Sequence, residues 1–323
     1  MKTSVRCVLL IVCAAVFAGS AQAQSYPVKP VRFIVPAPPG STPDFLARII
    51  GQKLTEKWGQ SVLVETVLGA SGNIATDRVA KSAPDGYTLL FNTIGPIAIN
   101  QNLFGKLPYD PVKDLTPITM VAITPNIVCV HPSLPAKNLK QLITLIKLNP
   151  GKLHYGSAGS GTTPHLSGEL LNTMASVKAV HIPYRSSAQM VIDVIGGQVE
   201  FTIHNAPSVL PFIQSGKLRA LAITSEKRQP YASELPTMAE AGLPGFVVHA
   251  WFGVIAPAGT PPAIMARIHD DVVSVIGMND VRERFMTQAA EPVGSKPEEY
   301  AAYIASEIVK WSKIVKESGA TLD

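Results

Sequence analysis

The chain has 323 residues, of which 46% are hydrophobic, and a formal net charge of +5 at pH 7. This length and apolar content are sufficient to bury two cores. The positive excess is small and scattered, which argues against a nucleic-acid-binding surface. Downstream of the first 23 residues, no apolar run reaches the roughly 20 residues that a membrane span needs.

The start of the chain has the pattern of a secretory signal peptide, residues 1–23. Lys2 and Arg6 form a basic region, residues 8–18 are apolar, and Ala21-Gln22-Ala23 is a small-residue cleavage site. We therefore predict export with cleavage near Ala23. Loss of the two basic residues lowers the net charge from +5 to +3.

Cysteine usage indicates a bacterial envelope. Cys7 and Cys13 lie in the predicted signal, so the mature chain keeps only Cys129 and cannot form an intramolecular disulfide. An exported chain without disulfides fits the periplasm of a Gram-negative bacterium. Lipidation at Cys13 is an alternative, but the bulky Val12 stands where a small residue is wanted. Cys129 lies in an apolar run and is expected to be a small buried residue rather than a nucleophile.

Strand-like and helix-like runs alternate along the chain, which is typical of parallel sheets with crossover helices. In chain order, we expect strands at 31–35, 61–65 and 88–92, with helices at 44–58 and 73–82 between them. A second series has helices at 139–148, 165–174, 188–195 and 209–214 and strands at 153–157, 179–182, 199–204 and 219–224. The last third holds an extended run at 247–256 and helices at 262–276, 280–288 and 297–318.

These series predict an α/β protein of two lobes, each a mostly parallel sheet flanked by helices. Lobe 1 comprises residues 24–123 plus 250–323, because the long final helix is expected to pack back on the first series. Lobe 2 comprises residues 124–249. The chain crosses between the lobes near 123–126 and 248–251, which are the predicted hinges. A cleft between two such lobes is a favoured place for a small ligand.

Two short motifs nearly repeat each other, one in each predicted lobe. They are Gly40-Ser41-Thr42-Pro43-Asp44 and Gly161-Thr162-Thr163-Pro164-His165, and each follows a predicted strand. Glycine permits close backbone approach, threonine can cap a helix, and proline is tolerated at the first helical position. Each motif therefore predicts an exposed helix N-terminus, where anions bind. One motif alone is compatible with an ordinary capped helix, whereas the pair suggests an anionic ligand held from both sides.

Polar residues at other predicted strand ends are further candidates. Asn92-Thr93, Tyr184-Arg185-Ser186 and Asn205 stand at such ends, although turn formation and N-capping explain them equally well. Arg185 could grip a carboxylate through two N–H groups or be tied up in a structural ion pair. Asp44 could stabilise its helix dipole or face the ligand, and His165 is expected to be aimed at the cleft.

Signatures of catalysis are largely missing. No Gly-x-Ser-x-Gly elbow passes through Ser157 or Ser160, and no glycine-rich loop completes a nucleotide-binding motif. The seven histidines show no His-x-x-x-His spacing, so we expect no metal and no cofactor. A secreted hydrolase using Ser157 or Ser160 with His165 is the alternative, although no orienting acid is evident.

Eight blocks, in order along the mature chain, resemble those of one known family. They are Tyr26-Pro-Val-Lys-Pro-Val-Arg-Phe-Ile-Val-Pro36, Asp85-Gly-Tyr-Thr-Leu-Leu90, Leu107-Pro-Tyr-Asp-Pro111, Pro150-Gly-Lys-Leu153, His181-Ile-Pro-Tyr-Arg185, Gly216-Lys-Leu-Arg-Ala-Leu-Ala222, Glu240-Ala-Gly-Leu-Pro-Gly-Phe246 and Ala256-Pro-Ala-Gly-Thr-Pro261. The chain resembles the Bug-type receptors, the periplasmic solute-binding components of tripartite tricarboxylate transporters. The resemblance implies a two-lobed periplasmic-binding (Venus-flytrap) fold without catalytic activity.

The resemblance also implies a ligand and a partner. The ligand would be a small carboxylate (a dicarboxylate, a tricarboxylate or an aromatic acid), delivered by a monomer to a two-component membrane permease. A carboxylate sensor feeding a membrane signalling partner would use the same lobes and stays an alternative. In the family, the ligand is held by the loops that match residues 38–44, 157–165 and 184–187, and the glycine-rich loop matches residues 69–72.

The chain departs from the family pattern near the expected cleft. Ala37 and Ser41 stand where members usually have an aromatic residue and paired glycines, and Ser71 and Ser186 stand where glycine is expected. We therefore expect a bulkier or aromatic ligand, whose binding phenylalanine at position 37 would weaken. The candidate ligand-binding residues are Pro39, Gly40, Ser41, Thr42, Asp44, Ser71, Asn92, Thr93, Ser157, Ser160, Gly161, Thr162, Thr163, His165, Tyr184, Arg185, Ser186 and Asn205.

Overall fold

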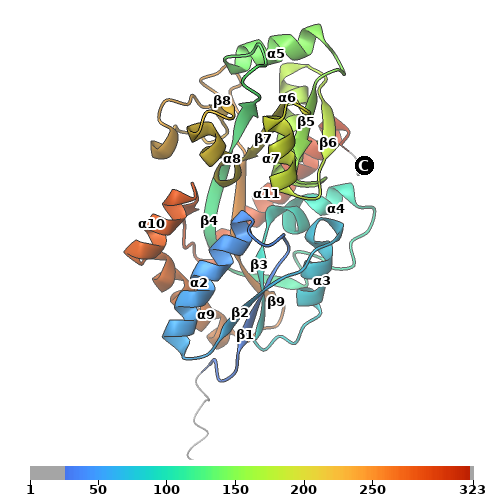
Figure 1. Ribbon diagram of the computed structural model, residues 1–323. Coiled ribbons are helices and arrows are strands. Elements are labelled where there is room, and N and C mark those ends of the chain that lie inside the picture. Colours follow the sequence, from blue (N-terminus) through green and yellow to red (C-terminus); the bar gives the residue numbers. More distant parts are fainter. Residues whose placement is uncertain (1–25, 321–323) are drawn as a thin grey trace, which may run out of the picture.

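The computed structural model describes residues 26–320, and the predicted signal peptide lies outside them. Helices flank a curled, mixed sheet (Figure 1). The strands are β1 (Val31–Val35), β2 (Val62–Thr66), β3 (Thr88–Asn92), β4 (Leu115–Val130), β5 (His154–Ser157), β6 (Val180–Pro183), β7 (Phe201–Asn205), β8 (Arg219–Ile223), β9 (His249–Pro257) and β10 (Glu291–Pro292).

The helices follow the expected order with shifts of a few residues at their ends. They are α2 (Thr42–Trp58), α3 (Asn73–Ala80), α4 (Asn100–Leu103), α5 (Leu139–Leu148), α6 (Thr163–Ala175), α7 (Ser187–Ile195), α8 (Ala206–Gln214), α9 (Pro262–Ile276), α10 (Asn279–Thr287) and α11 (Pro297–Ser318). Short helical turns are η1 (Ala70–Gly72), η2 (Gly95–Ile99) and η3 (Pro230–Ala232). The structure thus adds η2 and α4, which no periodic pattern predicts because each spans about one turn.

Strand pairing divides the sheet into two halves that share β4. The first half has the order β2-β1-β3-β9-β4 and the second β4-β7-β5-β6, with β8 and β10 also paired to β4. β1 is parallel to β2 and β3, and β5 is parallel to β6 and β7. β4 and β9, however, run antiparallel to their partners. The α/β class is therefore confirmed, but each half is mixed rather than mostly parallel, because β4 and β9 run antiparallel to the strands beside them.

The two crossings between the halves lie side by side. β4 runs from the first half into the second, and β9 begins beside it, with Thr124 paired to Ala250 and Pro125 to His249. The predicted hinge segments 123–126 and 248–251 thus form one antiparallel ribbon (Figure 1). We propose that this ribbon separates lobe 1, residues 24–123 plus 250–323, from lobe 2, residues 124–249.

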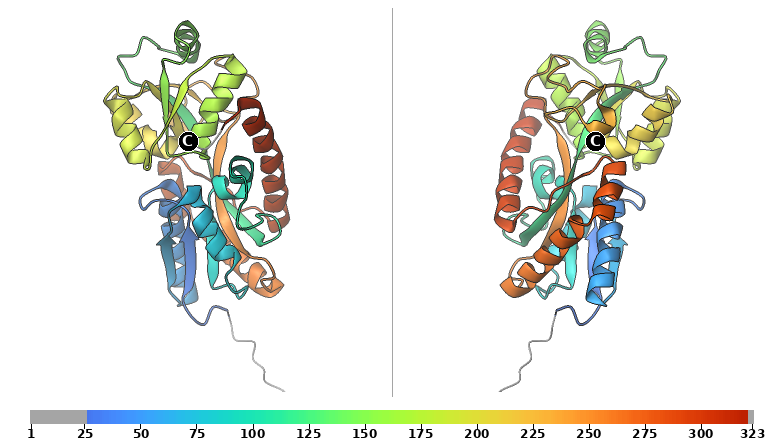
Figure 2. Two further views of the ribbon diagram at one scale, coloured as in Figure 1. Left: turned by 90° about the vertical axis from the view of Figure 1, so that its right-hand side faces the viewer. Right: turned by 90° about the vertical axis from the view of Figure 1, so that its left-hand side faces the viewer.

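The final helix reaches beyond lobe 1. Near its start, the hydroxyl of Tyr300 donates a hydrogen bond to Asn92 Oδ1 of β3 at 2.7 Å. The helix also packs against α6 of lobe 2, and Figure 2 shows it running alongside both halves. The expectation that α11 packs back on the first series is therefore incomplete: the helix is a third connection between the lobes.

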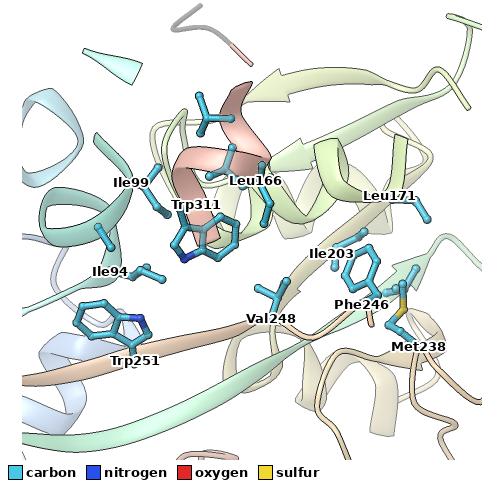
Figure 3. Close-up of a cluster of buried hydrophobic side chains, with 14 of the residues drawn as sticks. Ile94, Ile99, Leu166, Leu171, Ile203, Met238, Phe246, Val248, Trp251 and Trp311 are labelled. Carbon is cyan, nitrogen blue, oxygen red and sulfur yellow. The ribbon is translucent and has the colours of Figure 1, made fainter. Parts of the chain in front are cut away.

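A buried apolar cluster continues from one lobe into the other. Figure 3 shows the indole of Trp311, from α11, beside Ile99 of lobe 1 and Leu166 of lobe 2. Trp251 of β9 belongs to the same cluster, and both tryptophans are fully buried. The lobes therefore share part of their core along the side that α11 covers.

One buried carboxylate pairs with both of these tryptophans. Glu307 of α11 is 4% exposed, and its Oε2 accepts hydrogen bonds from Trp251 Nε1 at 3.1 Å and Trp311 Nε1 at 2.9 Å. Its Oε1 pairs with Lys310 Nζ at 3.0 Å. These contacts satisfy two indole N–H groups that burial would otherwise leave without acceptors.

Cys129 is the free cysteine of the described residues, and it is buried in β4. Burial raises the pKa of its thiol well above the usual range. Because the thiolate is the reactive form, this environment suits a packed residue, as the sequence predicts.

A buried histidine predicts acid sensitivity. His204 of β7 is 1% exposed, its ring nitrogens have no hydrogen-bond partner among the described residues, and burial lowers its pKa from 6.5 to about 4. Between about pH 6.5 and pH 4, the His204 imidazole is protonated in the unfolded chain but stays neutral in the folded chain. The free energy of unfolding therefore falls as pH drops through this window. We expect the urea concentration at the unfolding midpoint to decrease less between pH 6.5 and pH 4 in His204→Leu than in the unmodified protein. The same pH dependence in both proteins would contradict the prediction.

Candidate functional site

A cleft of about 700 Å³ has walls that come from both lobes. The first residues of several helices lie in these walls, among them Thr42 of α2, Thr163 of α6, Ser187 of α7 and Ser208 of α8. The first N–H groups of a helix have no acceptor within that helix, and its N-terminus is the positive end of the helix dipole. The cleft therefore collects hydrogen-bond donors and partial positive charge.

The first glycine motif forms a closed loop at the start of α2. Ser41 is the N-cap residue, and the helix begins at Thr42, so Pro43 is its second residue. The N–H of Gly40 donates to Asp44 Oδ2 at 2.8 Å, and Asp44 Oδ1 lies 2.9 Å from Arg48 Nη2. Asp44 is 3% exposed and does not line the cleft. Of its two expected roles, the structure favours the one within the helix start.

The second motif repeats this geometry with a different acceptor. Thr162 is the N-cap residue of α6, and the N–H of Gly161 donates to His165 Nδ1 at 3.2 Å. His165 is 2% exposed, and its ring stacks on that of His181 at 4.0 Å. The fifth residue of each motif therefore turns back to its own glycine, so the structure does not aim His165 into the cleft.

The two lobes touch each other beside the cleft. Ser71 Oγ of lobe 1 donates a hydrogen bond to the carbonyl oxygen of Ser160 in lobe 2 at 2.8 Å. A Cβ atom built on Gly95 would lie 3.1 Å from the carbonyl oxygen of Gly161. A Cβ built on Gly161 would lie only 2.6 Å from Asn100 Oδ1. Glycine at 95 and 161 therefore permits an approach of the lobes that a larger residue would obstruct.

The side chains of several other candidates contact partners within their own lobe. Asn92 accepts the Tyr300 hydroxyl, and Ser186 Oγ accepts the N–H of Ala188 at 3.2 Å as the N-cap of α7. Ser157 is fully buried, and its Oγ lies 2.6 Å from His181 Nε2. The Ser186 contact is the capping role that the sequence left open, whereas Asn92 and Ser157 bind residues distant in the chain.

The structure brings most of the candidates together, but not all. Those in the walls are Ser41, Thr42, Ser71, Thr93, Gly161, Thr162, Thr163, Tyr184, Arg185 and Asn205. Those beside or behind the walls are Pro39, Gly40, Asp44, Asn92, Ser157, Ser160, His165 and Ser186. Contact with a ligand stays a prediction for every candidate, and it applies first to the residues in the walls.

Sequence reasoning missed the apolar part of the walls. Leu68, Ala250 and Phe252 line the cleft together with the expected loops. Ala250 and Phe252 belong to β9, some 200 residues after the first motif. No local pattern identifies them as site residues, because their apolar character also suits a buried strand.

Arg185 is the only charged residue in the walls. It is exposed and forms no ion pair within the part of the chain that the structure describes. The alternative of a structural ion pair is therefore not seen there. One guanidinium, several helix N-termini and no wall carboxylate make the cleft suitable for an anion.

Two further features are absent from residues 26–320. No group of three His, Cys, Asp or Glu side chains is placed to hold a metal ion there. Within the same range, none of the helices is long and apolar enough to cross a membrane.

Comparison with known proteins decides the family. Residues 46–320 match the family described as Tripartite tricarboxylate transporter family receptor. The chain belongs to this family. Its members are solute-binding receptors, and the resemblance seen in the eight sequence blocks is thereby confirmed.

Curated relatives match along nearly their whole length. Protein BugT of Bordetella pertussis is 38% identical over 314 residues, which cover 97% of this chain and 96% of the relative. A protein of the tcbD-tcbE intergenic region in Pseudomonas sp. (strain P51) is 37% identical and covers 97% of this chain and 94% of its own.

Solved structures confirm the periplasmic-binding fold. R. palustris Rpa4515 with adipate has a TM-score of 0.88 at 38% identity, covering 92% of this chain and all of its own. The periplasmic binding protein BugD has a TM-score of 0.85 at 31% identity, covering 92% of this chain and all of its own. MatC from Rhodopseudomonas palustris with bound malate has a TM-score of 0.83 at 32% identity, covering 90% of this chain and all of its own.

Proposed function

We propose that this receptor captures a small carboxylate in the cleft between its lobes. The observation that carries the proposal is the chemistry of the walls, in which Arg185 and the N-termini of α2, α6, α7 and α8 meet without any aspartate or glutamate. The adipate and malate in the two similar structures support the same ligand class.

The energies indicate how such a ligand would be held. One helix N-terminus contributes roughly 0.3–1 kcal/mol, or about 2 kcal/mol when partly buried. Micromolar affinity needs about 8 kcal/mol. Helix dipoles therefore orient the carboxylate, and hydrogen bonds to Arg185 and to backbone N–H groups, together with desolvation, supply the rest.

A thermal-shift screen over dicarboxylates, tricarboxylates and aromatic acids tests the proposal. A ligand that binds only the folded chain, at a hundred times its Kd, stabilises it by about 2.7 kcal/mol, which corresponds to a rise in Tm of about 5 °C. We expect at least one acid to give such a shift. If none of the acids shifts the Tm, the proposed function is wrong.

The guanidinium of Arg185 should carry much of the affinity. A hydrogen bond to a charged group is worth about 1.5–3 kcal/mol, so Arg185→Gln should weaken binding of the best acid by about 10- to 100-fold in calorimetric titration. The matched control is Arg228→Gln, because Arg228 pairs with Glu240 on the surface of lobe 2 and does not line the cleft. Equal affinities of the two variants would refute this role.

Delivery to a two-component membrane permease from the periplasm extends the proposal. The family description supports it, and so does the predicted signal peptide. We expect the monomeric receptor to be required for uptake of the labelled acid by intact cells. Normal uptake in cells lacking it, with a changed transcriptional response to the acid, would favour the sensor alternative.

The Ser157–His181 contact is the observation closest to hydrolase chemistry. Ser157 is fully buried and does not line the cleft, so an ester in the cleft would not reach its hydroxyl. We expect mass spectrometry of acid released by denaturing the loaded receptor to recover it unchanged. Release of an alcohol from simple esters of that acid, abolished by Ser157→Ala, would favour the hydrolase instead.

A further inference from the structure

The two lobes contribute different chemistry to the cleft. The charged residue of the walls, Arg185, belongs to lobe 2. The larger aliphatic side chains and the phenylalanine of the walls, Leu68, Ile94 and Phe252, all belong to lobe 1. A ligand that fills the cleft therefore meets the cation in lobe 2 and the larger aliphatic side chains in lobe 1.

Leu68 is the most exposed of these apolar side chains. It is 57% exposed, whereas Phe252 is 4% and Ala37 is 9% exposed. Leu68 follows β2 and stands in the wall with the small Ala37. Single exposed leucines are common on proteins, but this one lines a cleft whose walls also include Ala37 and Phe252. Covering it with hydrocarbon would remove apolar surface from water on both partners.

The size of the cleft allows such a contact. Cavities of 300–1,000 Å³ typically hold drug-sized ligands, and this one measures about 700 Å³. A four-carbon acid would leave most of that volume to water. A longer chain or a ring would displace this water from the apolar wall.

We infer that Ala37, Leu68 and Phe252 form an apolar subsite that selects acids with an extended hydrocarbon body. The inference rests on the proposed function, because it needs a carboxylate anchored toward Arg185 and the start of α7. The hydrocarbon of the acid then lies against lobe 1. Each methylene group buried there should tighten binding about fourfold.

Calorimetric titration with butyrate, hexanoate and octanoate tests the inference, since these acids share one carboxylate and differ only in methylene groups. We expect Kd to fall about fourfold per added methylene. Leu68→Asn should reduce this increment, so that octanoate loses more affinity than butyrate does. Leu148→Asn is the matched control, because Leu148 is 75% exposed at the end of α5, outside the cleft.

A second variant tests the subsite by filling it instead of making it polar. Ala37→Phe should fill the subsite and weaken octanoate binding at least tenfold, a larger loss than the loss for butyrate. Equal affinity for butyrate and octanoate, or an increment that survives Leu68→Asn, would overturn the inference and leave the proposed function standing. Failure of these acids and of every acid in the thermal-shift screen would overturn the proposed function itself.

Discussion

Gly161→Ala is expected to weaken carboxylate binding at least tenfold. The new Cβ would lie 2.6 Å from Asn100 Oδ1 and 3.3 Å from Leu103 Cδ1, both in lobe 1. Asn100 cannot easily yield, because its side-chain amide donates to Asn73 Oδ1 at 2.6 Å and to the carbonyl oxygen of Ser71 at 3.1 Å. The variant should therefore disfavour the approach of the lobes seen in this structure, and with it any ligand contact made by both lobes.

The repeated motif provides a matched control. Gly40 and Gly161 have nearly the same backbone conformation, with φ of 77° and 79°, but a Cβ on Gly40 would meet no atom within 4 Å. Both alanine variants have the cost of a left-handed residue, about 1–2 kcal/mol of stability. Only Gly161→Ala adds the clash between lobes. Equal losses of affinity in the two variants, measured by calorimetry, would show that this contact is not needed for binding.

Glu307→Ala is expected to destabilise the folded chain by about 2–6 kcal/mol, because each of two buried N–H groups left without an acceptor costs about 1–3 kcal/mol. The variant leaves the indole N–H groups of Trp251 and Trp311 without their acceptor and removes the partner of Lys310. Because Trp251 lies in β9 at the crossing between the lobes, the variant removes hydrogen bonds from the region where α11 joins the two lobes. Urea unfolding followed by tryptophan fluorescence measures the change.

The same helix contains the control for this prediction. Glu317 pairs with Lys313 at 3.8 Å, and its side chain is 51% exposed. Surface pairs of this kind contribute about 0.3–0.5 kcal/mol, so Glu317→Ala should change stability by less than about 0.5 kcal/mol. An equally small change in the free energy of unfolding for Glu307→Ala would show that the buried network does not stabilise the junction between the lobes.

Local sequence signals predict most elements because most strands and helices here are short and separately patterned. β4 (Leu115–Val130) is the exception, since only the apolar run around Cys129, near its end, was evident from the sequence. Pro117 and Pro125 interrupt the pattern, and proline is normally confined to strand edges and bulges. In the structure, the pairing of β4 with β9 shifts register just after Pro117. The strand accommodates Pro117 at this irregularity, which no local pattern reveals.

For the candidate site, the sequence predicts the helix N-termini but not the directions of the side chains around them. The Gly-x-Thr-Pro pattern identifies the two N-termini, because capping and proline tolerance are local properties. The direction of Asp44 and His165 is set by the closed loops that they form with Gly40 and Gly161, and the spacing alone does not specify it. The meeting of the two motifs across the cleft depends on long-range topology. The difference between the two motifs therefore lies inside their loops, in the residue that closes each one.

The central claim is that the negative charge of a small acid is what the cleft binds. Calorimetric titration of the acid with the largest thermal shift, beside the corresponding neutral amide, tests it most directly. The two compounds have nearly the same shape and differ in charge. We predict that the acid binds at least a hundredfold more tightly than the amide. Arg185→Gln should reduce this ratio of affinities. Equal binding of acid and amide would contradict the account.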